Sequence, residues 1–358
     1  MHVILLSGGG GRRLWPLSND IRAKQFIPIF PVPVMPDRIG HPVPQGTPGQ
    51  ARGDESAGGD VRYESMLQRI CRQIRAVDPG SHITVATGAA QAPIIREQLG
   101  EGAVGISIEP CRRDTFPAIA LATAYLHDVQ GAGLDEPVVV CPVDPYVDAD
   151  YFQALRRLAD LAGAGTANLT LMGMEPTCPS EKFGYIIPES GAEVSRVETF
   201  KEKPSAAVAE EYIARGALWN GGVFAYQLRY VLDRAHELID FKDYQDLFDK
   251  YGGLTRISFD YAVVEHERDI AVMRFGGRWQ DIGTWDALTD ALDAPALGPA
   301  VIADDCREVN VVNETDTPVL CVGLENVIVS VSRDGILVCA RDKTATIKPY
   351  VDKLVDGK

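Results

Sequence analysis

Short apolar runs alternate along the first half of the chain with longer stretches in which apolar residues recur every three or four positions. A short apolar run is typical of a buried strand, and the longer period is typical of an amphipathic helix. The predicted strands are residues 3–6, 83–87, 104–108, 138–142 and 169–174, and the predicted helices are residues 64–77, 90–99, 116–128 and 149–162. This order predicts an α/β fold, with a mostly parallel Rossmann-like sheet flanked by helices.

The pattern changes after Pro295, where the expected helices stop. Short strands between turn signals then predict a small all-β appendage at the C-terminal end. The predicted strands there are residues 309–312, 319–322, 327–331 and 336–339. We therefore expect a large α/β domain over residues 1–295 and a small β-rich C-terminal domain over residues 296–358.

Residues 31–62 interrupt the α/β order. They hold many prolines and glycines, few bulky apolar residues and charges of both signs. This composition is typical of a solvated loop, and a structureless loop of this length is unusual inside a compact domain. We therefore interpret the segment as an inserted Pro/Gly-rich loop that decorates the domain and is separate from its catalytic machinery.

The overall charge narrows the range of partners. The 358 residues include 35 Lys and Arg and 50 Asp and Glu, which gives a formal net charge of −15. Such an excess of negative charge disfavours general binding to nucleic acid or to an anionic membrane. An anionic substrate therefore needs a local positive field, which Arg12, Arg13 and Lys24 are placed to supply.

The cysteines and the N-terminal residues bear on the cellular compartment in which the protein is expected. None of the seven cysteines forms a C-x-x-C pair, and several lie inside apolar runs, where buried reduced thiols are common. The N-terminus begins directly with a strand pattern, and no apolar stretch approaches 18 residues. We therefore expect a cytoplasmic protein.

Four consecutive glycines, residues 8–11, follow the first predicted strand and precede Arg12 and Arg13. Glycine lets the backbone come close to a ligand and turn its N–H groups toward one point, an arrangement suited to phosphate oxygens. Arginine and lysine add the charge that a polyphosphate needs. The alternative is a tight strand-to-helix turn with solvated arginines. A dinucleotide-binding fingerprint or a Walker loop that starts at Gly8 needs glycine where Arg13 stands, so neither matches.

Two aspartates far apart in the sequence are candidate metal ligands. Asp144 comes just after the strand at 138–142, where a carboxylate is well placed to hold Mg²⁺ against phosphate oxygens. The alternative for Asp144 is a turn-forming Asp-Pro pair. Asp281 lies shortly before a helix expected near Thr284, and its alternative role is the N-cap of that helix.

The segment Trp15-Pro16-Leu17-Ser18 and the tripeptide Lys24-Gln25-Phe26 follow the glycine loop. Together these three features resemble the N-terminal signature of the sugar-nucleotide pyrophosphorylases, and of the mannose-1-phosphate guanylyltransferases in particular. Further matches occur in family order at Glu109-Pro110, Gly184-Tyr185-Ile186, Glu202-Lys203-Pro204, Trp219-Asn220 and Asp260-Tyr261-Ala262. The chain departs from the family pattern at Phe183, where tyrosine is usual, and at Gly221, where serine is common.

The resemblance implies a GT-A-like nucleotidyltransferase domain and a role for each matched residue. It implies that Arg13 and Lys24 act in catalysis and that Asp144 and Asp281 hold the metal, Mg²⁺ or another divalent cation. The implied nucleotide-binding residues are Ser7, Gly8, Gly9, Gly11, Arg13, Lys24 and Glu109. The implied sugar-phosphate-binding residues are Gly184, Glu202, Lys203, Asn220 and Asp260.

The implied reaction is the transfer of a guanylyl group from GTP to α-D-mannose 1-phosphate, which gives GDP-mannose and pyrophosphate. Two alternatives stay open: the same chemistry on another sugar 1-phosphate or nucleoside triphosphate, and a catalytically inactive sugar-nucleotide-binding regulatory paralogue. GTP and mannose 1-phosphate are then the expected partners, with no nucleic acid or membrane partner and with a homodimer left open. The chain is short for the isomerase domain of bifunctional relatives, so we expect no isomerase activity.

Overall fold

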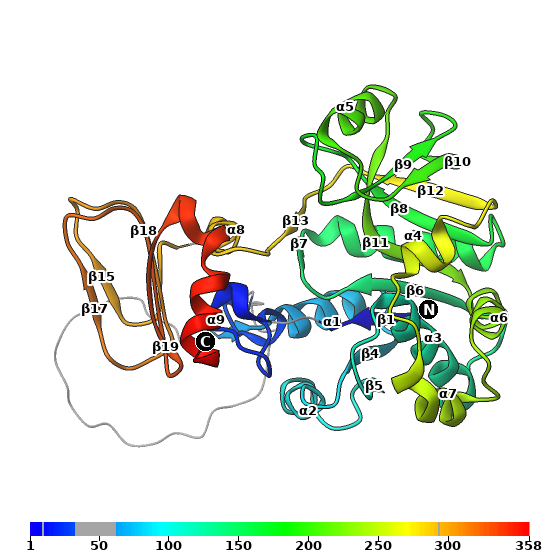
Figure 1. Ribbon diagram of the computed structural model, residues 1–358, viewed down its shortest axis with the longest axis horizontal. Helices are drawn as coiled ribbons and strands as arrows, with labels where there is room; N and C mark the ends of the chain where they lie inside the picture. The colour runs from blue at the N-terminus through cyan, green and yellow to red at the C-terminus, as the bar shows by residue number, and fades with distance from the viewer. Residues whose placement is uncertain (9–10, 33–61, 293, 358) are drawn as a thin grey trace, which may run out of the picture.

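The computed structural model describes residues 1–8, 11–32, 62–292 and 294–357. Nine strands within this part form one mixed sheet in the order β5-β4-β1-β6-β11-β8-β12-β10-β9, in which β10 and β11 run against the others (Figure 1). They are β1 (His2–Leu6), β4 (His82–Gly88), β5 (Gly105–Glu109), β6 (Pro137–Pro142), β8 (Leu169–Met174), β9 (Gly184–Pro188), β10 (Val194–Lys201), β11 (Leu218–Gln227) and β12 (Ile270–Phe275). The predicted α/β fold is confirmed, and its five predicted strands are present to within one residue of their expected ends.

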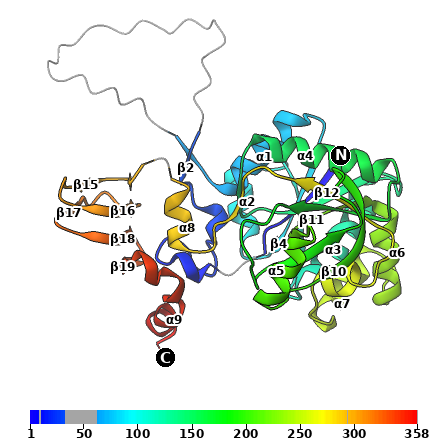
Figure 2. The same ribbon diagram turned by 90° about the horizontal axis from the view of Figure 1, so that it is seen from above.

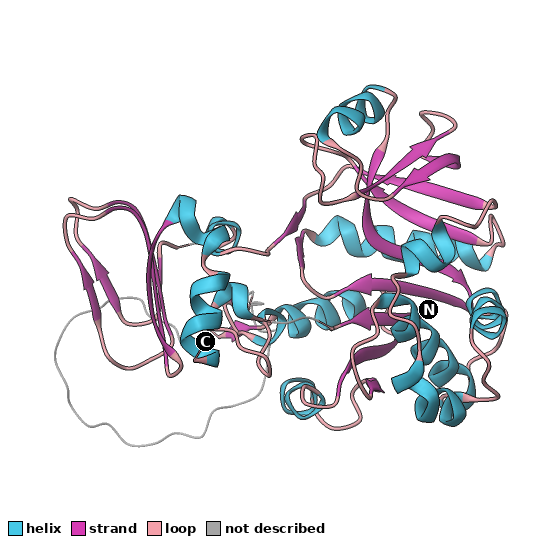
Figure 3. Ribbon diagram, in the orientation of Figure 1, coloured by secondary structure: helices cyan, strands magenta, loops and turns pink. Residues whose placement is uncertain are grey.

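Helices cover both faces of this sheet (Figure 3). The helices that lie with the sheet are α1 (Met66–Val77), α2 (Ala92–Leu99), α3 (Thr115–Ala124), α4 (Ala149–Gly163), α5 (Ala206–Ala214), α6 (Leu228–Leu238) and α7 (Tyr244–Lys250), whereas α8 (Trp285–Asp290) and α9 (Lys348–Asp356) lie with the C-terminal part. Successive side chains of a strand point to opposite faces, so Val3 and Leu5 pack with α1 and α4, whereas Ile4 packs with α3 and α6. Among the described residues no helix combines the length and the apolar character needed to cross a bilayer.

The four helices predicted from the sequence are present, with one difference in geometry. The helix expected over residues 116–128 leaves the α conformation after Ala124 and continues as a π-helical turn, Tyr125–Val129. Helix α3 is buried over nearly its whole length, because the sheet covers one side of it and α6 and α7 cover the other.

The carboxyl ends of the parallel strands lie along one edge of the sheet. Leu6, at the end of β1, pairs with Ala86 of β4 and Pro142 of β6, so the glycine loop and the residues that follow β6 emerge side by side. Strand β11 runs the opposite way, with Tyr226 level with Val138, so that its first residues lie at the same edge. Open α/β sheets bind ligands at this edge.

The C-terminal part is a coil of short strands with a helix at its end (Figure 2). Strands β14 (Ala296–Leu297), β16 (Arg307–Asn313) and β18 (Glu325–Ser332) form one parallel ladder, β15 (Ala300–Ile302) and β17 (Val319–Cys321) form a second, and β19 (Gly335–Ala340) pairs antiparallel with β18. The four predicted strands are therefore present. The expectation that helices stop after Pro295 is wrong, because α9 follows the strands.

The segment after the glycine loop packs against this C-terminal part. Trp15 shares a core with Trp285 of α8 and Val351 of α9. Trp285 Nε1 donates a hydrogen bond to Trp15 O at 3.1 Å, and Ser332 Oγ donates one to Pro16 O at 2.8 Å. Since this core draws residues from both sides of residue 295, the division of the chain into two domains there stays a prediction.

The predicted insertion over residues 31–62 lies, apart from its ends, outside the described residues. Its ends are paired with each other. Strands β2 (Phe30–Pro31) and β3 (Tyr63–Glu64) are antiparallel neighbours, and Val32 N donates a hydrogen bond to Arg62 O at 2.8 Å. The chain therefore leaves and re-enters the fold at adjacent points.

Gly335 marks a close approach between the C-terminal coil and Trp15. A Cβ at residue 335 would lie 2.5 Å from Cζ2 and 2.7 Å from Cη2 of the buried Trp15 ring. Because the ring cannot yield without moving its core, Gly335→Ala should lower the free energy of unfolding by about 1–3 kcal/mol. Gly191→Ala is the control, since a Cβ there meets nothing within 4 Å. Equal melting temperatures for the two variants would contradict this packing.

Candidate active site

A cavity of about 300 Å³ opens at the edge where β1 and β6 end. Its lining gathers residues that the sequence assigned to nucleotide binding, catalysis and metal binding. They are Ser7, Gly8, Gly11, Arg13, Lys24, Asp144 and Asp281. Gly9 lies outside the described residues. One cavity thus collects side chains from chain segments more than 250 residues apart.

The two motifs after the glycine loop bond to its two ends, Ser7 and Gly11. Buried Gln25 donates hydrogen bonds from Nε2 to Ser7 O at 3.1 Å and to Ser7 Oγ at 3.2 Å, and Ser18 Oγ donates one to Gly11 O. A Cβ at residue 11 would lie 2.6 Å from Asn19 O, so the chain needs glycine there to pack against its own following segment. The sequence showed both motifs but not this supporting role of Ser18 and Gln25.

The two arginines after the loop point to different places. Arg13 lines the cavity, and its Nη1 would lie 3.3 Å from a Cβ at Gly283. Arg12 forms ion pairs with the carboxylates of Asp20, Asp352 and Asp356. The expectation that Arg12 adds to the positive field at the ligand is therefore wrong, because its charge is matched by acidic groups, two of them on α9.

A short strand pair brings the two predicted metal ligands together. Strands β7 (Pro145–Val147) and β13 (Trp279–Asp281) are antiparallel, with Asp281 opposite Pro145 and therefore next to Asp144. The alternative role of Asp281 as a helix cap is wrong, because Thr284 caps α8 by accepting a hydrogen bond from Ala287 N.

The ammonium of Lys24 lies between these two carboxylates. Its Nζ is 2.9 Å from Asp144 Oδ2 and 3.3 Å from Asp281 Oδ1, and it donates a hydrogen bond to Ile282 O at 2.7 Å. The two side chains therefore already hold one cation. Carboxylate oxygens are also the ligands that Mg²⁺ prefers, so the donor set fits a divalent cation. Within the described residues, no group of three or more His, Cys, Asp or Glu forms a metal site.

A second cavity, of about 270 Å³, adjoins the first through Leu6, Gly8 and Thr115, which line both. Its lining includes Glu109 and Arg256. Burial is the largest influence on the Glu109 carboxyl and raises its pKa, although the Tyr251 hydroxyl, which donates to Oε2 at 2.7 Å, opposes this. Arg256 carries no motif of its own, and sequence reasoning missed it.

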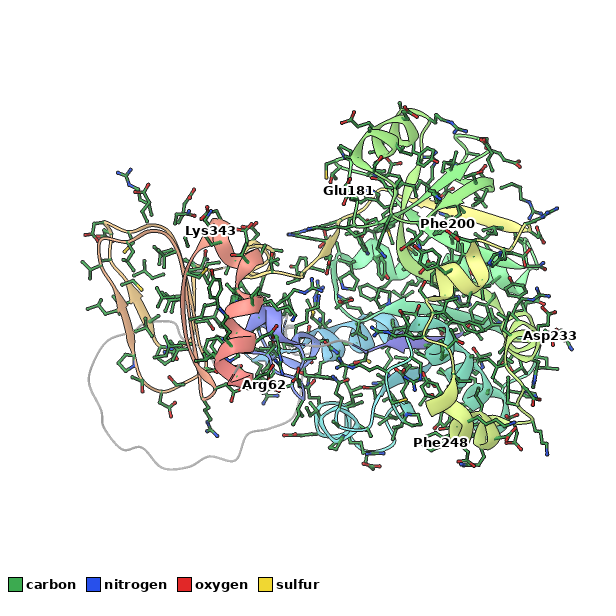
Figure 4. The ribbon with its side chains drawn as sticks, viewed as in Figure 1. Arg62, Glu181, Phe200, Asp233, Phe248 and Lys343 are labelled. Carbon is green, nitrogen blue, oxygen red and sulfur yellow. The ribbon has the colours of Figure 1, made fainter. Side chains whose placement is uncertain are left out.

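The five predicted sugar-phosphate residues form one cluster on the β9–β11 side of the sheet. Asn220 Nδ2 donates a hydrogen bond to Asp260 Oδ1 at 2.6 Å, and Lys203 Nζ pairs with Glu202 Oε1 at 2.6 Å. A Cβ at Gly184 would lie 2.5 Å from Glu202 Oε2 and 3.0 Å from Phe200 Cζ, so a larger residue there would displace the Glu202 carboxylate. Figure 4 shows Phe200 on the same side of the sheet.

Most of the large sheet matches a known family, and the matched residues include Asp144 and Asp281 but not the glycine loop or Lys24. The model of the Nucleotidyl transferase family matches residues 61–296. The chain belongs to the nucleotidyl transferase family. Since the match spans most of the sheet and both carboxylate-bearing strand ends, the protein is a sugar-phosphate nucleotidyltransferase, and enzymes of this family generally use a divalent cation.

Curated relatives of this nucleotidyltransferase align over nearly its whole length. The chain is 30% identical over 377 residues to the xanthan biosynthesis protein XanB of Xanthomonas campestris pv. campestris strain B100. This alignment covers 98% of the chain and 72% of XanB. It is 26% identical over 382 residues to a mannose-1-phosphate guanylyltransferase of Escherichia coli, which covers 98% of the chain and 75% of that protein.

A solved structure from Thermus thermophilus, described as a mannose-1-phosphate geranyltransferase, is similar to the whole nucleotidyltransferase. The TM-score is 0.75 at 27% identity, and the alignment covers 99% of each chain. The shared fold therefore includes the C-terminal coil as well as the large sheet.

The buried carboxyl of Asp260 should make the stability of the protein depend on pH. Burial, and after it the charge of Glu202, raises the pKa of Asp260 from 3.8 to about 6. The folded carboxyl therefore binds a proton more readily than the unfolded one, so that ionisation of Asp260 lowers stability as the pH rises from about 4 to about 6 and remains unfavourable above that range. Asp260→Asn should raise the free energy of unfolding by up to ~3 kcal/mol at pH 7.5 and by about half as much at pH 5.

Urea denaturation at these two pH values measures the difference. The control is Asp233→Asn, which removes a carboxylate on the exposed side of α6 (Figure 4). An equal gain at both pH values for Asp260→Asn would contradict a raised pKa.

Proposed function

We propose that this nucleotidyltransferase converts GTP and α-D-mannose 1-phosphate into GDP-mannose and pyrophosphate. The observation that carries the proposal is that a carboxylate and a guanidinium, those of Glu109 and Arg256, line the second cavity (here the base cavity), which adjoins the first cavity with Arg13 and Lys24 in its wall (here the phosphate cavity). Relatives named mannose-1-phosphate guanylyltransferase support the choice of both substrates.

The base cavity favours guanine by its hydrogen-bonding pattern. Guanine presents N–H donors at N1 and N2 and acceptors at O6 and N7. Glu109 has one oxygen engaged by Tyr251, and its other oxygen, Oε1, lies 3.7 Å from the position of a Cβ at Gly8, on the loop side. That oxygen would accept from the guanine N–H groups, and Arg256 would donate to O6 or N7. Adenine presents no ring N–H donor to such a carboxylate.

The phosphate cavity supplies charge to the triphosphate. Arg13 and Lys24 would pair with phosphate oxygens, and backbone N–H groups of the glycine loop would donate to them. Asp144 and Asp281 would hold the divalent cation, which when bound neutralises phosphate charge. In the sugar cluster, the carboxylates of Glu202 and Asp260 and the amide of Asn220 suit sugar hydroxyls, and Lys203 suits the sugar phosphate.

The reaction then needs positioning more than covalent help. An oxygen of the sugar phosphate attacks the α-phosphorus of the nucleotide as the bond to the bridging oxygen of pyrophosphate breaks. No histidine or cysteine lines the described walls of the phosphate cavity. The hydroxyls of Ser7, Ser18 and Thr115 are already engaged in hydrogen bonds with Gln25, Gly11 and Phe259. Direct transfer between two bound substrates therefore fits the site, with charge neutralisation and orientation lowering the barrier.

Release of pyrophosphate tests this function. With Mg²⁺ and mannose 1-phosphate, GTP should support turnover at a kcat/KM at least about 100-fold above that with ATP, UTP or dTTP, because guanine offers the Glu109 carboxylate two adjacent N–H donors, whereas uracil and thymine offer one and adenine offers no ring N–H. With GTP held constant, glucose 1-phosphate is the comparison for the sugar. Equal turnover with another nucleotide or sugar phosphate would change the substrate assignment, and no turnover with any pair would favour the inactive regulatory paralogue.

A substitution of Arg256 tests whether this residue binds the guanine base. Arg256→Gln should lower kcat/KM for GTP by about 10- to 100-fold, because the loss of a charged hydrogen bond removes about 1.5–3 kcal/mol. The KM for mannose 1-phosphate should stay within a factor of two. Arg268→Gln, an exposed arginine outside both cavities, is the matched control. A loss that falls equally on both substrates would contradict the role of Arg256 at the base.

A further inference from the structure

Lys24 occupies the position between Asp144 and Asp281 that a bound cation would take. We propose that its ammonium is an exchangeable counter-ion of the free site, which leaves the two carboxylates when a divalent cation arrives together with the nucleoside triphosphate. This inference rests on the proposed function in one respect: the nucleoside triphosphate whose phosphate oxygens attract Lys24 is the proposed substrate. It assigns Lys24 a second task, which is to keep the divalent site closed in the absence of substrate.

The contacts of Lys24 are those of a bridging cation. Its Nζ lies within 3.3 Å of a carboxylate oxygen on each side and donates a third bond to Ile282 O. The Lys24 side chain is 18% exposed, whereas those of Asp144 and Asp281 are 40% and 48% exposed. The two carboxylates are therefore more exposed to solvent than the ammonium that bridges them.

The charge of the free site explains why a divalent cation would not bind first. Asp144 and Asp281 contribute two negative charges, and Lys24 and Arg13, which line the same cavity, contribute two positive charges, so the sum is zero. A divalent cation alone would have to displace the ammonium or lie beside it, and charges of the same sign a few ångströms apart repel strongly in a partly buried site. A triphosphate changes this sum, because its oxygens give Lys24 a new partner.

The backbone around Lys24 allows the side chain to turn while its anchor stays fixed. Residues Lys24–Phe26 form a 3₁₀ turn in which Gln25 and Phe26 are buried, and Gln25 is bonded to Ser7. The carboxylates are fixed separately by the β7–β13 pairing. Exchange of the cation therefore requires only a rotation of the four-carbon stem of Lys24, whose rotamers are separated by small barriers.

A matched control exists elsewhere in the chain. Lys250 on α7 also lies between two carboxylates, with Nζ 2.9 Å from Asp246 Oδ2 and 4.0 Å from Asp240 Oδ2. It does not line the phosphate cavity. Lys250→Gln leaves a similar pair of carboxylates without a bridging ammonium. The variant therefore shows how much the loss of a bridging lysine alone changes the affinity for a divalent cation.

The test is the binding of Mn²⁺ to the full chain without nucleotide, measured by electron paramagnetic resonance of the free ion. Lys24→Gln should bind one Mn²⁺ at least 10-fold more tightly than the unaltered protein, whereas Lys24→Arg and Lys250→Gln should bind it no more tightly. Addition of Asp281→Asn to Lys24→Gln should abolish the gain. In the unaltered protein, GTP should raise the Mn²⁺ affinity at least 10-fold above the affinity of GTP alone for Mn²⁺, which a protein-free titration measures.

Any other result would contradict the proposal that Lys24 and the divalent cation exchange at the two carboxylates. Equal Mn²⁺ affinity of Lys24→Gln and the unaltered protein would mean that the cation and the ammonium do not compete. An equal gain in Lys250→Gln, or a gain that survives Asp281→Asn, would mean that the cation binds elsewhere. Since the nucleotide-free titration does not depend on base or sugar, a failure of guanylyl transfer with a successful titration would overturn only the substrate assignment.

Discussion

The pairing of two three-residue strands, β7 and β13, is the constraint on which the candidate site depends. It places Asp281 opposite Pro145 and so brings together two carboxylates that lie 137 residues apart in the sequence. Strand β13 also leads directly into α8, whose Trp285 packs against Trp15. This short antiparallel pairing thus fixes the positions of Asp144 and Asp281 relative to each other. It also lies where the chain passes from the large sheet to the C-terminal coil. A change that separates these strands would leave Lys24 with at most one of its two carboxylate partners.

The glycine loop is positioned by parts of the chain that carry no reactive group. Gln25 and Ser18 bond to the loop from within, whereas Ser332 and Trp285 bond to the segment that follows it. A phosphate-binding loop rich in glycine has little rigidity of its own, because glycine has wide backbone freedom in the absence of contacts. The hydrogen bonds at Ser7 and Gly11 and the Trp15 core fix the two ends of the loop. The C-terminal coil therefore supports the segment that follows the glycine loop, and the similarity to the Thermus thermophilus structure extends over this coil.

The sequence predicted those features that depend on local pattern. Apolar runs such as 138–142 and 169–174 define their strands almost to the residue, and the parallel order places Asp144 and the glycine loop at one edge. Features that depend on contacts between distant segments could not be predicted in this way. The partners of Arg12, the place of Arg256 in the base cavity and the bridge made by Lys24 all require the folded arrangement of segments that no local pattern connects. Helix α9 is a different case, because its signal is local and was missed. Roles of the site residues remain proposals, and the geometry supports them by proximity and charge.

The central claim is that this site transfers a nucleotidyl group directly between two bound substrates by charge and position, with no covalent protein intermediate. Exchange of labelled pyrophosphate into GTP tests it most directly. Without mannose 1-phosphate, the account predicts no exchange, because nothing on the protein accepts the guanylyl group; GDP-mannose should allow exchange through the reverse reaction. Rapid exchange with GTP, pyrophosphate and Mg²⁺ alone would require a guanylylated protein and would contradict the account.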